Sequence, residues 1–328
     1  KDISVHSMYL DVSCGEILDL ANAVDDMKEM LIMTPNKPDI IYKDDPINML
    51  KIIRYASQWQ WDIEKRTWFG ILKHHELIKK VSMERIKTEL EKILLSTEPS
   101  YGLERLLTSG LLYDIFPQLY QLNQISVDDK TLYKHTLDVV DGVKPNLVTR
   151  LAALFHDLGK PFSMHKKKFV GYEVKSRNIA EALMKSLGYD SVIQEKVLKL
   201  IKYQNVFAHY SLDVLPKDNV LRKFAKLIGD DLDNAMDFII ADMGSDDNKK
   251  FIYANLIEEN IHRVINEDKD DEIELPVDGK TLMEEFNVRS GPMIGLLLAK
   301  IKESCKQNPN LTKEEALKIA NEHLALIV

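Results

Sequence analysis

Apolar residues recur at helical spacing along most of this chain, and that pattern limits the fold to packed helices. After Asp45 and Pro46, the side chains of Ile47, Leu50 and Ile53 follow one another three residues apart, which is typical of one face of an α-helix. An acid directly before a proline also indicates a helix start, with the acid as the N-terminal cap. From this point onward the sequence predicts a mainly α-helical protein.

Residues 1–30 differ from the rest and read as short extended pieces. The segment ISVHSMYLDV alternates in part between apolar and polar residues, and SCGEILDL places a glycine turn before an apolar run. Alternation next to a turn signal is typical of a hairpin. This pattern favours the last hairpin of a mixed α/β domain.

The length of 328 residues exceeds the usual size of one domain, so we expect two or three helical modules in series. The acidic segment NEDKDDEIE at residues 266–274 is the best linker candidate, since like charges repel and bury nothing. No run in the sequence approaches the roughly 18 apolar residues that span a bilayer. We therefore expect no membrane insertion.

The charge and the cysteines exclude some classes of protein. A net charge of -8 argues against nonspecific coating of nucleic acid, which usually requires an excess of Lys and Arg, so any RNA contact must be local. Cys14 and Cys305 lie far apart without a CxxC spacing, which favours neither a disulfide framework nor a zinc ribbon and fits a reducing cytoplasm. The sequence begins at Lys1 without a signal-peptide pattern, and we expect an N-terminal segment to precede it.

A candidate metal cluster combines two histidines with two acids. His156 and Asp157 end an apolar helix that Gly159 and a following proline stop. An isolated His-Asp pair is most often a helix-end histidine beside a solvated acid. Here, however, His135 begins another apolar helix, and Asp242 lies in FIIADM, where an unpaired carboxylate would be costly. Two imidazoles and two carboxylates on different helices suit a divalent transition metal better than calcium.

The segments KHTLDVV, LAALFHDLGKP and IIADM resemble the HD phosphohydrolase superfamily. This resemblance implies that His135, His156, Asp157 and Asp242 bind a metal that activates water against a phosphate ester. Relatives often have a histidine where this chain has Tyr172, and paired histidines where it has Tyr203-Gln204. We therefore expect at most one metal ion, and a structural polar cluster remains the alternative.

A larger resemblance extends over nearly the whole chain. It rests on four motifs in a fixed order: KDISVHSMYLDVSCGEILD; DDPINMLKIIRYASQWQWDIE; VSMERIKTELEKILLS with GLERLLTSGLLYDIFPQL; and LPVDGKTLMEEFNVRSGPMIGLLLAKI. Together they are similar to the bacterial tRNA nucleotidyltransferase family of CCA-adding enzymes and poly(A) polymerases. The resemblance implies a mainly α fold with the end of an α/β nucleotidyltransferase head at 1–40, a helical neck at 41–125, an HD body at 126–265 and a helical tail at 275–328.

The family resemblance also implies an activity, which is the addition of C and A residues from CTP and ATP to the 3′ end of a tRNA in the cytoplasm. The two carboxylates that hold catalytic Mg²⁺ in the family stand in a D-x-D segment upstream of the part this chain matches. We therefore expect no catalytic residue here and no transfer by this chain alone. CCA addition and poly(A) addition remain equally open, and the oligomeric state is not predicted.

Six residues are candidates for nucleotide binding by the same resemblance, in which an Asp and an Arg of the neck pair with the base edge of CTP or ATP. Asp45 is retained, whereas Asn48 stands where the family has that Arg, which puts base selection in question. The set is Lys1, Asp2, Asp45, Asn48, Lys51 and Arg54.

Four residues of the tail are candidates for RNA binding. Gly291 and Pro292 open a predicted helix whose free N–H groups could receive a phosphate, although ordinary packing of that helix explains the same residues. The set is Lys280, Arg289, Gly291 and Gly295. Two alternatives to tRNA end synthesis stay open, namely an HD-type metal-dependent phosphohydrolase and a noncatalytic RNA-binding relic.

Overall fold

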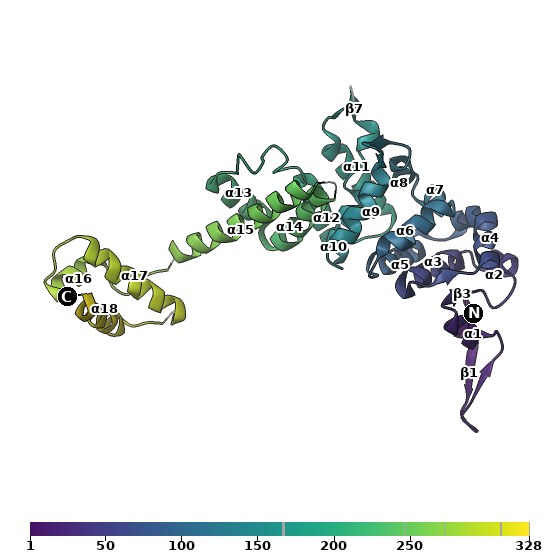
Figure 1. The fold of residues 1–328 in the computed structure, drawn as a ribbon, viewed down its shortest axis with the longest axis horizontal. Helices are drawn as coiled ribbons and strands as arrows, with labels where there is room; N and C mark the ends of the chain where they lie inside the picture. The colour runs from purple at the N-terminus through teal and green to yellow at the C-terminus, as the bar shows by residue number, and fades with distance from the viewer. Residues whose placement is uncertain (166–167, 246, 272, 309, 328) are drawn as a thin grey trace. The chain divides into compact units, whose positions relative to one another are not determined.

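The computed structural model describes residues 1–165, 168–245, 247–271, 273–308 and 310–327. They form two compact units, one of Lys1–Pro216 with Lys226–Glu258 and one of Lys217–Ala225 with Glu259–Val328. Both units consist mainly of helices, as the sequence predicts (Figure 1). Among the described residues, no helix is both long and apolar enough to cross a membrane.

The N-terminal segment forms the expected hairpin. Strands β1 (Met8–Asp11) and β2 (Glu16–Asp19) pair antiparallel, with Met8 opposite Asp19. Gly15 in the turn has a φ of +76°, which only glycine adopts without strain. The segment continues through α1 (Ala23–Lys28) to β3 (Leu31–Ile32), which pairs in parallel with β4 (Asp62–Ile63).

The next part of the first unit, the neck, is a set of short helices around a central one. The central helix α3 (Ile47–Trp59) is apolar on most of its circumference and packs against α5 and α6. Buried Arg54 of α3 donates to Glu89 of α5 at 2.6 Å, so that a charge in the core is paired. The other helices are α2 (Pro38–Asp44), α4 (Lys65–His74), η2 (His75–Lys80), α5 (Met83–Leu94), α6 (Pro99–Thr108), α7 (Leu111–Ile115) and α8 (Pro117–Leu122).

The start of α3 corrects one prediction. Asp45 follows the end of α2, Pro46 occupies the N-cap position of α3, and no side chain caps this helix. The Asp45 carboxylate instead pairs with Arg85 of α5. The local pattern identified the helix start correctly, but a charged partner on a neighbouring helix outcompetes the cap.

The rest of the first unit, the body, surrounds α10 (Leu147–Phe155). The side chain of Asn146 accepts from two backbone N–H groups at the start of α10, and the helix packs against α9, α12 and α14. Arg150 of α10 is buried and donates to the carbonyl oxygens of Val143 and Leu94, which joins the body to the neck. The surrounding elements are β5 (Ser126–Val127), β6 (Lys130–Thr131), α9 (Leu132–Gly142), η3 (Lys160–Phe162), β7 (Met164–His165), β8 (Lys168–Phe169), α11 (Tyr172–Ser186), α12 (Ser191–Tyr203), η4 (Gly229–Asp231) and α14 (Leu232–Gly244).

The second unit has its own apolar core among α16 (Gly279–Phe286), α17 (Pro292–Gln307) and α18 (Lys313–Ile327). Two helices, α13 (Asp218–Ile228) and α15 (Asn248–Asp271), contribute residues to both units. The acidic segment expected as a linker is therefore helical as far as Asp271. Two arginines compensate part of its charge, since Arg222 pairs with Asp268 at 2.7 Å and Arg263 pairs with Glu267 at 2.8 Å.

Candidate metal centre and nucleotide pocket

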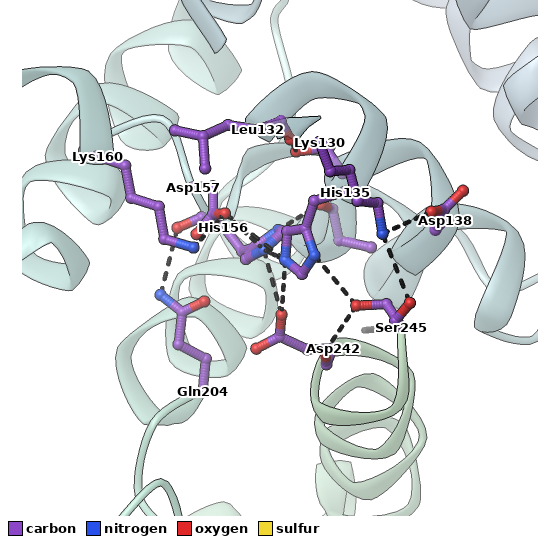
Figure 2. A network of polar contacts seen from close by, with 12 residues as sticks. Lys130, Leu132, His135, Asp138, His156, Asp157, Lys160, Gln204, Asp242 and Ser245 are labelled. Carbon is purple, nitrogen blue, oxygen red and sulfur yellow. Dashed lines mark hydrogen bonds and ion pairs between the residues drawn. The ribbon is translucent and has the colours of Figure 1, made fainter. Parts of the chain in front are cut away.

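All four residues of the predicted metal cluster converge in the body. His135 comes from α9, His156 and Asp157 follow α10, and Asp242 comes from α14. His135 Nε2 lies 3.3 Å from His156 Nε2 and 3.1 Å from Asp242 Oδ1, and His156 Nε2 lies 3.3 Å from Asp157 Oδ2. Figure 2 shows these side chains pointing toward one shared space.

The two histidines are held with their Nε2 atoms toward that space. His156 Nδ1 lies 2.7 Å from the Ala153 carbonyl oxygen, and because a carbonyl can only accept, Nδ1 carries the hydrogen. His135 Nδ1 lies 3.1 Å from Ser245 Oγ, which also donates to the Asp242 carbonyl oxygen. Such outer hydrogen bonds are what orient a metal-binding imidazole.

The electrostatics of the cluster favour a cation. Burial would lower the pKa of His156, but the charges of Asp157 and Asp242 outweigh it and raise that pKa to about 10. Burial likewise opposes ionisation of Asp157, yet His156 and Lys160 hold its pKa below the usual value. His156 and His135 also keep the pKa of Asp242 low against its burial. Two ionised carboxylates that stabilise a protonated imidazole would equally stabilise a metal ion.

One oxygen of the cluster lacks a hydrogen-bond partner in the described structure. Asp157 is 0% exposed, its Oδ2 accepts from Lys160 Nζ at 2.6 Å, and its Oδ1 is buried without a hydrogen bond. An orphaned buried carboxylate oxygen is costly. His135, His156 and Asp157 offer ligand atoms within 4.8 Å of one another. The donor set therefore fits a divalent transition metal.

A cavity of about 500 Å³ opens beside the cluster. His135 and Asp242 line it together with Lys160, Tyr172 and Asn205. The Tyr172 hydroxyl, at a position where relatives often have a histidine, accepts from Asn205 Nδ2 at 2.8 Å. No sequence pattern predicts a role for Lys160 or Asn205 at this site, although the lysine lies in the same HDLGKP segment.

A second cavity, of about 360 Å³, lies between the N-terminal segment and the neck. Five of the six nucleotide-binding candidates line it, namely Lys1, Asp2, Asp45, Asn48 and Lys51. Asp2 is fixed from two sides, with Oδ1 2.9 Å from His6 Nδ1 and Oδ2 3.8 Å from Lys51 Nζ. Burial alone would raise the pKa of Asp2, but the hydrogen bond from His6 lowers it below the usual value.

Arg54, the sixth candidate, does not line this cavity. It lies on the buried side of α3, where its guanidinium contacts the ring of Tyr55 at 3.6 Å and donates to Glu89 and Gln58. The neck motif places this arginine two turns after the start of α3, and helical geometry directs it toward α5. Arg54 therefore forms a structural pair with Glu89, and its guanidinium does not line the cavity.

Comparison with known proteins agrees with this layout. Residues 61–122 match the family described as "Probable RNA and SrmB- binding site of polymerase A", and residues 132–242 match the HD domain. The CCA-adding enzyme of Lactococcus lactis subsp. lactis is 24% identical over 96% of this chain and 68% of its own length. Over nearly its whole length the chain is therefore similar to CCA-adding enzymes.

Other CCA-adding enzymes are similar to a shorter part of the chain or share its fold. The CCA-adding enzyme of Limosilactobacillus reuteri is 32% identical over 119 residues, which are 36% of this chain and 29% of that protein. The crystal structure of the Bacillus stearothermophilus CCA-adding enzyme in complex with CTP has a TM-score of 0.55 at 16% identity, covering 99% of this chain and 73% of that one. This likeness shows that the two share a fold.

The tail carries the four RNA-binding candidates in the second unit. Lys280 lies in α16, Arg289 precedes α17, and Gly291 and Gly295 lie at and near the start of α17; all four are exposed. A side chain added at Gly291 or Gly295 would meet no atom within 4 Å. The surface there is open, and the role of these residues in RNA binding stays a prediction.

Proposed function

We propose that this chain serves tRNA 3′-end synthesis, in which C and A residues are added from CTP and ATP to the end of a tRNA. The similarity to a CCA-adding enzyme over 96% of the chain carries the proposal. The cavity between the N-terminal segment and the neck supports it, and a solved relative is a complex with CTP. None of the cavity residues is assigned to the Mg²⁺ of nucleotidyl transfer, for which the resemblance requires a pair of head carboxylates.

In this proposal different cavity residues bind the triphosphate and the base of the nucleotide. The ammonium groups of Lys1 and Lys51 would attract the triphosphate, and Asp45 would accept from the exocyclic amine of the base. Cytosine and adenine both present an amine beside a ring nitrogen that accepts, whereas uracil and guanine present the reverse order. A single acceptor and a neighbouring donor therefore suffice to admit C and A.

The test is extension of a tRNA that lacks its CCA end by the complete gene product, supplied with CTP, ATP and Mg²⁺. We expect incorporation of C and then A, followed on a sequencing gel, and no incorporation from UTP or GTP alone. Normal tRNA binding without any incorporation would contradict end synthesis. It would leave a noncatalytic RNA-binding role.

A second function is favoured by the four-residue cluster of the body, which we propose is a metal-dependent phosphohydrolase centre. His135, His156, Asp157 and Asp242 would hold the ion, and the unpartnered Oδ1 of Asp157 supports this. A bound transition metal would activate water against a phosphate ester. The protein's own contribution is to orient both imidazoles, keep the carboxylates ionised and provide the adjacent cavity of about 500 Å³ for the ester.

Metal binding can be measured on the chain itself. We expect Mn²⁺, Co²⁺ or Ni²⁺ to bind with a stoichiometry near one and to stabilise the fold by about 2.7 kcal/mol at a free concentration 100 times the dissociation constant. His156→Ala and Asp157→Ala should abolish this increment, whereas His262→Ala, at an exposed histidine of α15, should keep it. Elemental analysis without bound metal, together with no thermal shift, would mean that the cluster is purely structural.

A further inference from the structure

The structure pairs a residue that lines the nucleotide cavity with Arg85, to which neither the sequence pattern nor the resemblance assigns a role. Arg85 of α5 holds the carboxylate of Asp45 with two parallel bonds, Nη1 to Oδ1 at 3.1 Å and Nη2 to Oδ2 at 2.7 Å. Asp45 is at the same time a lining residue of the cavity of about 360 Å³. Arg85 itself does not line the cavity, but its guanidinium is bonded to a carboxylate that does.

The paired bonds between Arg85 and Asp45 leave further hydrogen-bonding groups of both side chains unused. Each terminal nitrogen of Arg85 carries a second hydrogen, and each oxygen of Asp45 carries a second lone pair. In a planar carboxylate–guanidinium pair these free groups lie in one plane, with the acceptor beside the donor. That edge is complementary to cytosine and adenine, whose amine stands beside an accepting ring nitrogen. It opposes uracil and guanine, in which donor and acceptor are exchanged.

Asn48, at the position where the resemblance places the base-reading arginine, is less suited to this discrimination. Asn48 is 9% exposed on α3, and its side-chain amide is uncharged. An amide presents a donor or an acceptor depending on how it rotates, so it can pair with either order of groups. A guanidinium can only donate.

We propose that Arg85 is a specificity-determining residue of the nucleotide pocket, which reads the base together with Asp45. The inference rests on the proposed nucleotide-binding function. The packing of α5 against α3 supplies the guanidinium that the neck motif lacks at position 48. The side chains of Arg85 and Asp45 are 50% and 33% exposed, so the pair remains open to an incoming base.

The test compares nucleotide binding by the chain and its variants, by calorimetric titration with CTP, UTP, ATP and GTP. We expect the unmodified chain to prefer CTP over UTP and ATP over GTP. Arg85→Met and Arg85→Lys should each reduce both preferences by about tenfold, because lysine keeps the charge but not the planar fork. Lys87→Met removes a charge from the same helix, where Lys87 bonds to the Gly188 carbonyl oxygen, and should change the preferences less than about threefold.

Melting temperatures would verify that each variant is folded. The inference would be overturned if the Arg85→Met variant kept both nucleotide preferences. It would also be overturned if Asn48→Ala were the only variant to lose them. Failure of the unmodified chain to bind any of the four nucleotides would instead overturn the proposed nucleotide site itself. The two failures are therefore distinguishable in one series of titrations.

Discussion

Asp114 illustrates how single charged residues are paired in the neck. Its side chain is 1% exposed and contacts His75 Nδ1 at 2.5 Å and the ammonium of Lys79 at 2.8 Å. Burial alone would raise the pKa of Asp114, but the hydrogen bonds from Lys79 and His75 lower it below the usual 3.8. The carboxylate therefore stabilises the fold in its ionised form and fixes η2 against α7.

We expect Asp114→Asn to lower the free energy of unfolding by about 1–3 kcal/mol near neutral pH, because it leaves the Lys79 ammonium without a counter-charge and removes an acceptor beside His75. The pKa of Asp114 is lower in the folded state than in the unfolded state. The stabilisation is therefore fully present above about pH 4 and disappears as the pH falls through the folded-state pKa. Urea denaturation at pH 7 and pH 3 checks this. Asp25→Asn in an exposed pair with Lys28 is the control, with a change below about 0.5 kcal/mol. An Asp114→Asn effect that persists undiminished at pH 3 would show that it does not come from ionisation.

Helices and turns were predictable from the sequence where a local rule determines them. The helix that ends before Gly159 is one case, since its apolar spacing and its stop signal lie within a few residues. Gly159 also has a tertiary reason that no local rule contains. A side chain there would overlap the Tyr172 carbonyl oxygen and lie 2.5 Å from Ser176 N. The glycine thus allows α11 to approach the turn that carries His156 and Asp157.

Contacts between elements distant in sequence were not predictable in the same way. The fork between Asp45 and Arg85 joins residues 40 positions apart, and the turn at Asp45 looks locally like a capped helix start. The acidic segment is helical to Asp271, and Arg222 and Arg263 pair with two of its acids. The metal cluster was foreseeable only because its residue types matched a known pattern, and its roles stay predictions.

The molecule as a whole carries a net charge of -8, so attraction between the entire protein and RNA cannot drive binding. Any RNA contact should come from local groups of cations, and we predict that Lys280 of α16 and Arg289, which precedes α17, form one such group. Residues 61–122, which match a family described as a probable RNA-binding site, are a second candidate region. Binding through a few phosphates predicts a moderate dependence on salt rather than the steep one of a highly basic protein.

We expect the double variant Lys280→Ala with Arg289→Ala to bind tRNA about tenfold more weakly and to flatten the plot of log Kd against log salt concentration. Each lost phosphate contact should reduce that slope by about 0.7–0.9, because one fewer counterion is released from the RNA on binding. Filter binding of a tRNA lacking its CCA end, measured between about 50 and 200 mM salt, gives both quantities. Lys185→Ala, in an exposed pair with Glu181 on α11, is the matched control and should leave affinity and slope unchanged. A double variant that loses affinity with an unchanged slope would indicate a distorted tail rather than lost phosphate contacts, and one with unchanged affinity would remove these two residues from the RNA-binding surface.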